Sequence, residues 1–247
     1  MGVDPVTAGA RCLLLLHGLG ATGAVWTPVA ALLAARGVRS VAPDLPGHGA
    51  AARAAGYSVG AAAADLATQL AGEPQLYVVG HSFGGYVALA LASGWFGVRV
   101  HGVLVVGTKL SFSTEERSRA AELARRPARV FPSRAEALER YRKVSGLDTT
   151  LAPGDALLAR GVVGEAAGFR LAADPAASGV EVPPFLELLA AARCPVVAAR
   201  GEFDPLVSGA ELRAAVPDSI DVAGRGHNLH VEDPASLVAL ADRLLAS

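Results

Sequence analysis

The sequence has few cysteines, few aromatic residues and almost no net charge. Among its 247 residues there are two cysteines, Cys12 and Cys194, and 5% are aromatic. Two cysteines are too few for a disulfide scaffold, and each opens an apolar run that favours a buried, reduced strand residue over a single disulfide. No Cys/His cluster has the spacing of a metal site, so we expect neither a metal nor an organic cofactor.

The charge balance and the hydropathy exclude further classes of protein. A net charge of −1 offers no overall field that would favour nucleic acid or an anionic membrane. No stretch approaches the roughly 20 apolar residues of a membrane-spanning helix. The first residues, Met1 to Pro5, lack the basic start and apolar segment of a signal peptide. We therefore expect a cytoplasmic protein that acts on a small molecule.

Strand-like and helix-like segments alternate along most of the chain. Alternating elements of this kind predict an α/β domain with a mostly parallel sheet and helices on both faces. A length of 247 residues fits one such domain with an insertion. The expected strands cover residues 11–16, 38–42, 76–79, 100–106, 195–199 and 219–223, and the expected helices cover residues 24–36, 58–71, 86–92, 208–215 and 234–245.

Residues 108–190 interrupt the alternation. They are helix-like throughout and contain six prolines, so we predict a helical insertion between core segments 1–107 and 191–247. From Lys109 to Lys143 there are ten Lys/Arg and five Glu, which gives +5 against −6 for the rest of the chain. Solvated faces of amphipathic helices account for such a pattern. Alternatively, this positive charge steers an anionic substrate or an acidic carrier protein toward the site.

The motif G-x-S-x-G occupies residues 80–84, between the strand-like run 76–79 and the helix-like run 86–92. A serine between a strand and a helix sits on a sharp, strained turn, and glycines on both sides let the backbones approach. The turn exposes the Ser82 oxygen near the positive end of a helix. Chance can supply the pentapeptide in a chain with 28 glycines. It is the strand–turn–helix context that indicates a nucleophile.

Two glycine-bearing loops follow the first two expected strands, at residues 17–20 and 44–49. The carboxyl ends of parallel strands lie along one edge of a sheet, so these loops should flank Ser82. An oxyanion needs two preorganised donors, for which the backbone N–H groups of Leu19 and Phe83 are candidates. We interpret the polar residues of the loops as shaping the loops rather than as catalysts: His17, Asp44 and His48.

A serine hydroxyl is a weak nucleophile unless a base takes its proton and an acid orients the base. Asp204 and Glu202 follow the expected strand 195–199, and His227 and His230 follow the strand 219–223. His227 is flanked by Gly226 and is free to reach inward, whereas His230 lies nearer the last helix. The chain order serine, acid, histidine after consecutive strands indicates a catalytic set.

At this point the chain resembles the α/β-hydrolase superfamily, for which this elbow and this triad order are known. The resemblance implies Ser82 as nucleophile, His227 as base and Asp204 as orienting acid. It also implies the amides of Leu19 and Phe83 as oxyanion hole and residues 108–190 as a cap. Serine at the elbow separates the chain from the dehalogenase and epoxide-hydrolase branches, which use aspartate there. The matching motifs span nearly the whole chain: His17-Gly18, Asp44-x-x-Gly47-x-Gly49, Gly80-x-Ser82-x-Gly84, Gly201-x-x-Asp204, and Gly226-His227 followed by Glu232-x-Pro234.

One departure from the superfamily concerns the start of the chain. Only about ten residues precede the first expected strand, where superfamily members usually have an antiparallel hairpin. We therefore predict that the hairpin is missing or reduced and that the core sheet has about six strands.

The expected activity is hydrolysis of an ester or thioester with a small to medium, largely apolar acyl group. The expected pocket residues are Trp26, Phe112, Leu206 and Leu229. The same fold also serves carbon–carbon bond hydrolases, hydroxynitrile lyases, perhydrolases and tailoring enzymes of secondary metabolism, because specificity lies in the pocket. Thioester release from an acidic carrier protein and a non-enzymatic ligand receptor are further alternatives.

Overall fold

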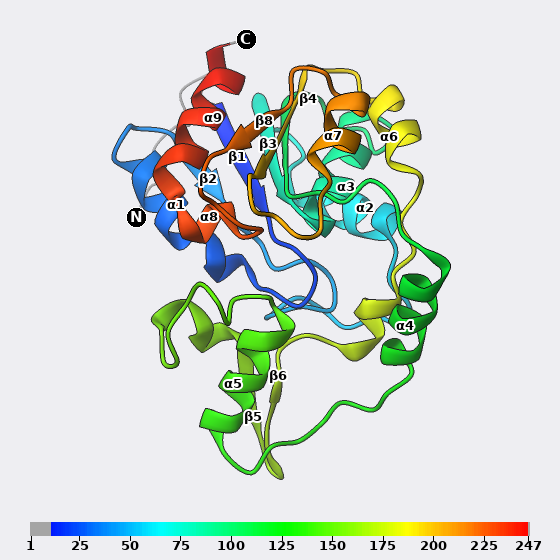
Figure 1. Cartoon of the computed structure of the whole chain (residues 1–247), viewed down its shortest axis with the longest axis vertical. Coiled ribbons are helices and arrows are strands. Elements are labelled where there is room, and N and C mark those ends of the chain that lie inside the picture. Colours follow the sequence, from blue (N-terminus) through cyan, green and yellow to red (C-terminus); the bar gives the residue numbers. More distant parts are fainter. Residues whose placement is uncertain (1–10, 247) are drawn as a thin grey trace.

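The computed structural model describes residues 11–246, which are built around a six-stranded sheet (Figure 1). The strand order is β2-β1-β3-β4-β7-β8, and each pair of neighbours is parallel. The predicted parallel sheet of six strands is confirmed, whereas the predicted loss of a preceding hairpin falls on residues outside the described part. The strands are β1 (Arg11–Leu16), β2 (Arg39–Val41), β3 (Gln75–His81), β4 (Val100–Val106), β7 (Val196–Gly201) and β8 (Ile220–Val222).

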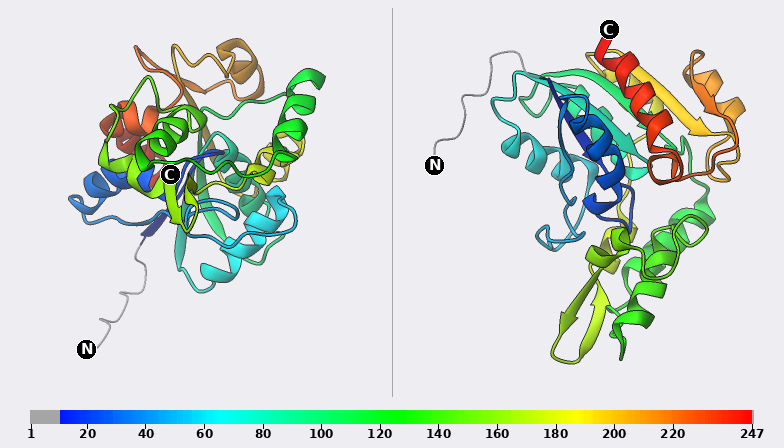
Figure 2. Two further views of the ribbon diagram at one scale, coloured as in Figure 1. Left: turned by 90° about the horizontal axis from the view of Figure 1, so that it is seen from below. Right: turned by 90° about the vertical axis from the view of Figure 1, so that its left-hand side faces the viewer.

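Helices cover both faces of the sheet (Figures 1 and 2). One face carries α1 (Thr27–Ala34), α8 (Leu229–Glu232) and α9 (Pro234–Ala246), and the other carries α2 (Val59–Gln69), α3 (Phe83–Ala92), α6 (Phe185–Ala191) and α7 (Gly209–Ala215). Successive side chains of a strand point to opposite faces. Leu14 and Leu16 of β1 accordingly enter the core with α2 and α3, and Leu13 and Leu15 enter the core with α1 and α9. No helix within residues 11–246 is both long and apolar enough to span a membrane.

The strand order fixes where a ligand can bind. From β1 the chain adds β2 on one side and then returns to add β3 on the other side. At such a reversal the connections diverge, and a crevice opens at the carboxyl ends of the two central strands. The loops after β1 and β3 border this crevice, and they carry His17–Gly20 and Ser82.

Residues 108–190 lie between β4 and β7 and contribute no strand to the six-stranded sheet. The expectation that they are helical throughout is wrong, because β5 (Val162–Glu165) and β6 (Gly168–Leu171) form an antiparallel hairpin (Figure 2, right). Phe131 bridges to Phe169 beside it, and a Cβ on Gly168 would lie 2.4 Å from the Phe131 carbonyl oxygen. The alanines of the connecting turn disguised the hairpin, since they favour helix. The other elements here are α4 (Thr114–Ala124), α5 (Arg134–Val144), and the 3-10 turns η2 (Ala156–Gly161) and η3 (Pro175–Gly179).

The last helix of this segment, α6, packs in the core of the six-stranded sheet. Phe185 and Leu188 of α6 are buried in the same core as α3. The boundary of the insertion at residue 190 stays a prediction, and this packing favours an earlier one, before α6.

Both cysteines are free. Cys12 is buried in β1, as expected for a reduced strand residue. Cys194 is partly exposed and precedes β7 instead of lying in it, so its predicted strand position is wrong. The strand starts later because Pro195 has no backbone N–H to give to a ladder.

Candidate active site

Ser82 occupies the turn between β3 and α3 in a strained backbone conformation. Its φ of 51° and ψ of −116° make it the single non-glycine residue with positive φ among residues 11–246. Such strain costs on the order of 1–3 kcal/mol and persists where the surroundings impose it. The Ser82 N–H donates to the Val106 carbonyl oxygen at 2.9 Å, and the Thr108 hydroxyl donates to the Ser82 carbonyl oxygen at 3.2 Å. Hydrogen bonds to its N–H and to its carbonyl oxygen therefore hold the serine in place.

The two glycines of the motif are required by close backbone approach. A Cβ on Gly80 would lie 2.3 Å from the Gly84 carbonyl oxygen, and a Cβ on Gly84 would lie 2.4 Å from the Leu16 carbonyl oxygen. Neither contact can be relieved by moving a side chain, since both partners are backbone. The spacing in the sequence thus reflects the packing of α3 against β1 and β3.

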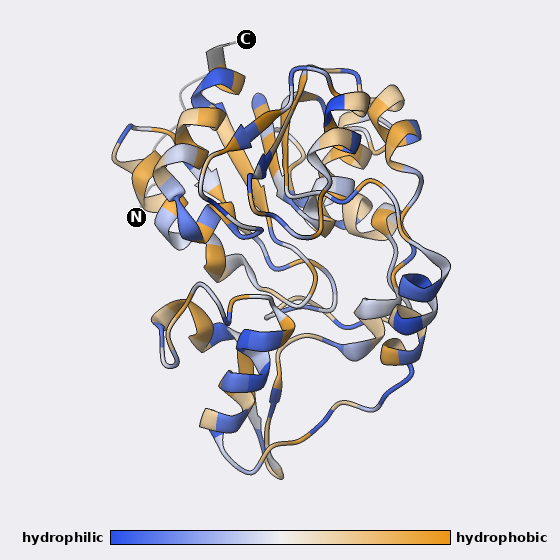
Figure 3. Ribbon diagram, in the orientation of Figure 1, coloured by the Kyte–Doolittle hydropathy of each residue, from blue (hydrophilic) through white to orange (hydrophobic). Residues whose placement is uncertain are grey.

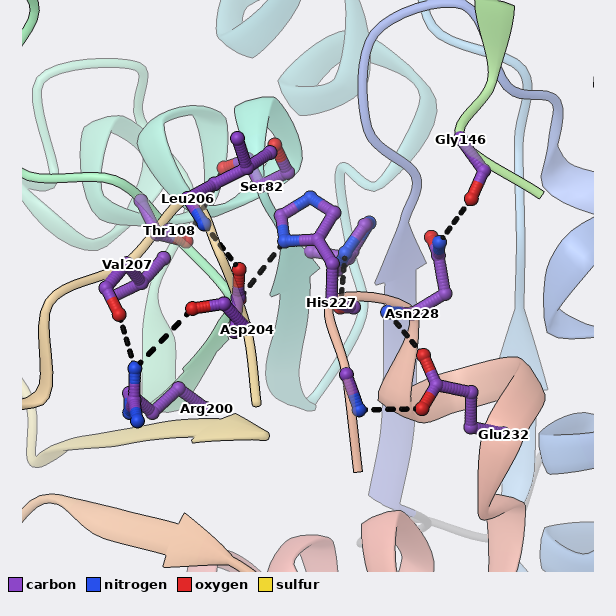
Figure 4. Close-up of polar contacts among 12 residues, drawn as sticks. Ser82, Thr108, Gly146, Arg200, Asp204, Leu206, Val207, His227, Asn228 and Glu232 are labelled. Carbon is purple, nitrogen blue, oxygen red and sulfur yellow. Dashed lines mark hydrogen bonds and ion pairs between the residues drawn. The ribbon is translucent and has the colours of Figure 1, made fainter. Parts of the chain in front are cut away.

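Asp204 and His227 meet across the ends of β7 and β8 (Figure 4). His227 Nδ1 lies 2.9 Å from Asp204 Oδ2, and the Leu206 N–H donates to Asp204 Oδ1 at 2.8 Å. The Asp204 side chain is fully buried, whereas the His227 side chain is 17% exposed. Donation from Nδ1 to the carboxylate leaves Nε2 of a neutral imidazole as an acceptor.

Ser82 and His227 line one cavity of about 240 Å³. No hydrogen bond joins the Ser82 hydroxyl to His227 within the described chain. Hydrogen bonds of this kind are often long without substrate and tighten when it binds. Ser82, His227 and Asp204, the three residues selected from the sequence, thus lie together at the carboxyl edge of the sheet.

The two competing residues lie elsewhere. Glu202 accepts a hydrogen bond from the Gly224 N–H at 2.8 Å and, among the described residues, forms no hydrogen bond or ion pair with His227. His230 is buried and stacks between Trp26 and His81, with ring centroids 4.6 and 4.4 Å away. Neither lines the Ser82 cavity.

The loops after β1 and β2 are locked together by two histidines. The Leu45 N–H donates to His17 Nε2 at 2.9 Å, and the Gly20 N–H donates to His48 Nε2 at 3.0 Å. Asp44 accepts hydrogen bonds from the N–H groups of Gly23 and Ala50 at 2.7 and 2.9 Å. These three polar residues shape the loops, as expected from the sequence.

Two backbone donors that have no protein acceptor in the described chain lie beside Ser82. Leu19 is adjacent to Gly20, which His48 holds, and Phe83 is the first residue of α3. Within residues 11–246 neither the Leu19 nor the Phe83 N–H donates to a protein acceptor. Both residues line the Ser82 cavity.

Burial of the histidines predicts a pH-dependent stability. Desolvation lowers the pKa of His17 and of His230 to about 3 each. Below about pH 6.5 the unfolded chain binds protons at these sites that the folded chain does not, down to about pH 3. Each histidine therefore removes about 1.4 kcal/mol of unfolding free energy per pH unit in this window.

Urea unfolding between pH 7.5 and 5.5 measures this effect before most carboxylates begin to titrate. We expect the unfolding free energy to fall over this range, and a His17→Gln variant should show a shallower slope. A wild-type stability that stays level from pH 7.5 to 5.5 contradicts the assignment.

Two further residues fix the backbone around His227, and this role was not predicted from the sequence for either of them. Glu232 accepts hydrogen bonds from the N–H groups of Gly226 and Asn228, on either side of His227, at 2.5 and 2.9 Å. His81 Nε2 donates to the His227 carbonyl oxygen at 3.0 Å. Glu232, an acidic residue five positions after His227, could have indicated the first of these contacts from the sequence. The second joins residues 146 positions apart and left no local signal.

The predicted pocket residues divide evenly. Phe112 and Leu206 line the Ser82 cavity. The predictions for Trp26 and Leu229 are wrong, because both are fully buried in the core with α1 and α9. Trp26 ends η1 with its ring against His230, and Leu229 opens α8 facing the same core.

Comparisons with known proteins show the family of the chain and its fold. The sequence model described as "Alpha/beta hydrolase family" matches residues 13–240. A thioesterase domain from the curacin biosynthetic pathway superposes with a TM-score of 0.77 at 25% identity, covering 97% of this chain and 92% of that one.

Two curated relatives match a shorter stretch. Lipase LipV of Mycobacterium tuberculosis is 39% identical over 88 residues, which is 35% of this chain and 33% of the lipase. The magnesium-chelatase 30 kDa subunit of Rhodobacter capsulatus is 42% identical over 94 residues, which is 36% of this chain and 33% of that subunit. The matched stretch thus spans about a third of the length of each relative.

Proposed function

Since this chain belongs to the alpha/beta hydrolase family, we propose that it is a serine hydrolase that cleaves an ester or thioester through an acyl-enzyme. In this proposal Ser82 is the nucleophile, His227 the general base and acid, and Asp204 the residue that orients His227. The observation that carries the proposal is the 2.9 Å contact between His227 Nδ1 and a fully buried Asp204, beside a strained Ser82 that lines the same cavity as His227.

The reaction follows from this arrangement. Ser82 Oγ attacks the carbonyl carbon while His227 Nε2 takes its proton, and Asp204 stabilises the resulting imidazolium. The carbonyl oxygen becomes an oxyanion that accepts hydrogen bonds from the Leu19 and Phe83 N–H groups. His227 then protonates the leaving alcohol or thiol, and the acyl group stays on Ser82. A water deprotonated by His227 attacks the acyl-enzyme and releases the acid.

The inserted segment is the proposed cap over this site. Residues of α4 and residues 178–182 form the far wall of the Ser82 cavity, together with Phe112. A volume of about 240 Å³ lies below the common range for drug-sized ligands, which is about 300–1,000 Å³. This size, together with the apolar side chains of Phe112, Val180 and Val182 in the lining, favours a small to medium acyl group.

A panel of p-nitrophenyl esters and of acyl thioesters of N-acetylcysteamine, with acyl chains from acetyl to decanoyl, tests the proposal. We expect Ser82-dependent turnover that is highest for short to medium chains and falls for long ones. Hydrolysis that persists after Ser82→Ala, or no hydrolysis of any ester or thioester, would contradict it.

The charge of the inserted segment favours a second candidate, a thioesterase for an acidic carrier protein. Residues 109–143 carry +5, and α4 and α5 are coloured largely hydrophilic in Figure 3, unlike the helices on the sheet. Docking through this surface would weaken with salt, because exposed charges are screened within about 10 Å at 0.1 M. If carrier-bound and free thioesters lose activity equally as salt rises, carrier docking is unsupported.

A further inference from the structure

A second and larger cavity adjoins the Ser82 cavity and has a different electrostatic character. Its volume is about 610 Å³, and it lies between α4, α5 and η3 of the inserted segment. Leu19 and Ser178 line both cavities, so the two share a wall. We call this space the basic cavity, after four of its lining side chains: Arg126, Arg129, Arg140 and Lys143.

The positive charge of the basic cavity is not balanced within it. The single carboxylate in its lining, Asp174, accepts hydrogen bonds from the Tyr57 hydroxyl at 2.8 Å and from the Ala176 N–H at 3.1 Å. By contrast, the lining of the Ser82 cavity is balanced, with two cations, Lys109 and Arg117, and two carboxylates, Glu116 and Glu181. An anion entering this face of the molecule is therefore attracted to the basic cavity.

The guanidinium groups of the basic cavity are available to a ligand. Arg129 and Arg140 form no ion pair within residues 11–246, and Arg129 lies 4.7 Å from the centre of the Phe131 ring. Arg126 and Lys143 pair with Glu122 and Glu139, each four residues earlier in the chain, and both partners of each pair are exposed. Such exposed pairs contribute little and yield to a better acceptor. Arginine presents its N–H groups in a fork that matches a carboxylate or phosphate.

The position of the basic cavity indicates which part of a substrate reaches it. His227 lines the Ser82 cavity but not the basic cavity, and the leaving group must lie within reach of His227. The basic cavity is instead lined by Leu19 and Gly20, and Leu19 is one of the two candidate oxyanion donors. The part that extends past Leu19 is then the acyl group.

We propose that the substrate is an ester or thioester whose acyl group ends in an anion, a carboxylate or a phosphate, and that the basic cavity binds this anion. This inference rests on the proposed function and adds the chemical class of the acyl group. The apolar part of the Ser82 cavity, around Phe112, Val180 and Val182, takes the methylene chain, and Arg129 and Arg140 take the charged end.

The test compares the mono-p-nitrophenyl ester of adipic acid with p-nitrophenyl hexanoate, which has the same chain length and no charge. We expect Arg140→Gln and Arg129→Gln each to lower kcat/KM for the anionic ester by about tenfold, the scale of a charge-assisted hydrogen bond. The neutral ester should be unaffected. Arg119→Gln, an exposed change on α4 that lines neither cavity, is the matched control. High salt should reduce the preference for the anionic ester in the wild-type chain.

Calorimetric binding of the anionic ester to Ser82→Ala, with and without Arg140→Gln, separates this inference from the proposed function. Binding that weakens with Arg140→Gln supports the basic cavity even if no ester is turned over. An anionic-to-neutral ratio that is the same for wild type, Arg140→Gln, Arg129→Gln and Arg119→Gln would overturn the inference and leave the hydrolase intact.

A further experiment tests whether the bound anion belongs to the acyl group or to the leaving group. The same neutral acyl group is offered on coenzyme A and on N-acetylcysteamine, which differ in the phosphates of the leaving group. If Arg140→Gln slows the coenzyme A thioester but not the adipate ester, the cavity serves the leaving group and the proposed acyl class is wrong.

Discussion

Ser82→Ala is expected to lower kcat on the best ester of the panel by on the order of 10⁶, the loss seen when the nucleophile of a comparable triad is removed. The variant should keep the turn between β3 and α3, because the Ser82 side chain lines the cavity and alanine only removes its hydroxyl. Its circular dichroism and melting temperature should therefore match the wild type. Residual turnover measured over long incubation gives the size of the effect.

Ser111→Ala is the control for this change. Ser111 is exposed and follows β4 at a distance from the elbow in sequence. We expect it to leave kcat unchanged. If Ser82→Ala stays within about tenfold of the wild type, another group performs the attack and the assignment of Ser82 is wrong.

Asp204→Asn carries the second largest expected effect, a fall in kcat of about 10⁴. The Leu206 N–H requires an acceptor at Oδ1, so an asparagine would keep its oxygen there and turn its NH₂ toward His227 Nδ1. The imidazole would then carry its proton on Nε2 and could not accept one from Ser82. The loss comes from the wrong tautomer rather than from a changed cavity.

Glu202→Gln is the matched control for Asp204→Asn, since it removes the same charge from the same loop. Glu202 accepts a hydrogen bond from the Gly224 N–H and, among the described residues, forms no hydrogen bond with His227, so kcat should change little. Circular dichroism spectra and melting temperatures of both variants separate a loss of catalysis from a folding defect. Equal losses in the two variants would contradict the role of Asp204.

The features that could be predicted from the sequence are those that depend on neighbouring residues in the chain. The turn at Ser82 follows from two glycines four positions apart between a β-branched run and an Ala/Leu run. The carboxyl edge follows from strands that alternate with helices, and this placed the residues after β7 and β8 near Ser82. The choice of His227 over His230 rested on the neighbouring Gly226 and on the distance from the last helix, and the structure places His227, not His230, against Asp204.

The remainder could not be predicted because it depends on contacts between distant residues. Trp26 was expected in the pocket, yet the packing of η1 turns its ring toward His230 in the core. The bonds from Gly20 to His48 and from His81 to His227 span 28 and 146 positions. The β5–β6 hairpin was hidden by alanines, and the basic cavity appears only when α4 and α5 face each other.

The most direct test of the central claim is covalent labelling with a fluorophosphonate, followed by intact-mass spectrometry and peptide mapping. An activated serine at the elbow predicts one adduct per chain, on the peptide that contains Ser82, and no adduct in Ser82→Ala. Labelling should slow markedly in Asp204→Asn and remain at the wild-type rate in Glu202→Gln. An absence of labelling, or an adduct on another residue that persists in Ser82→Ala, would contradict the account.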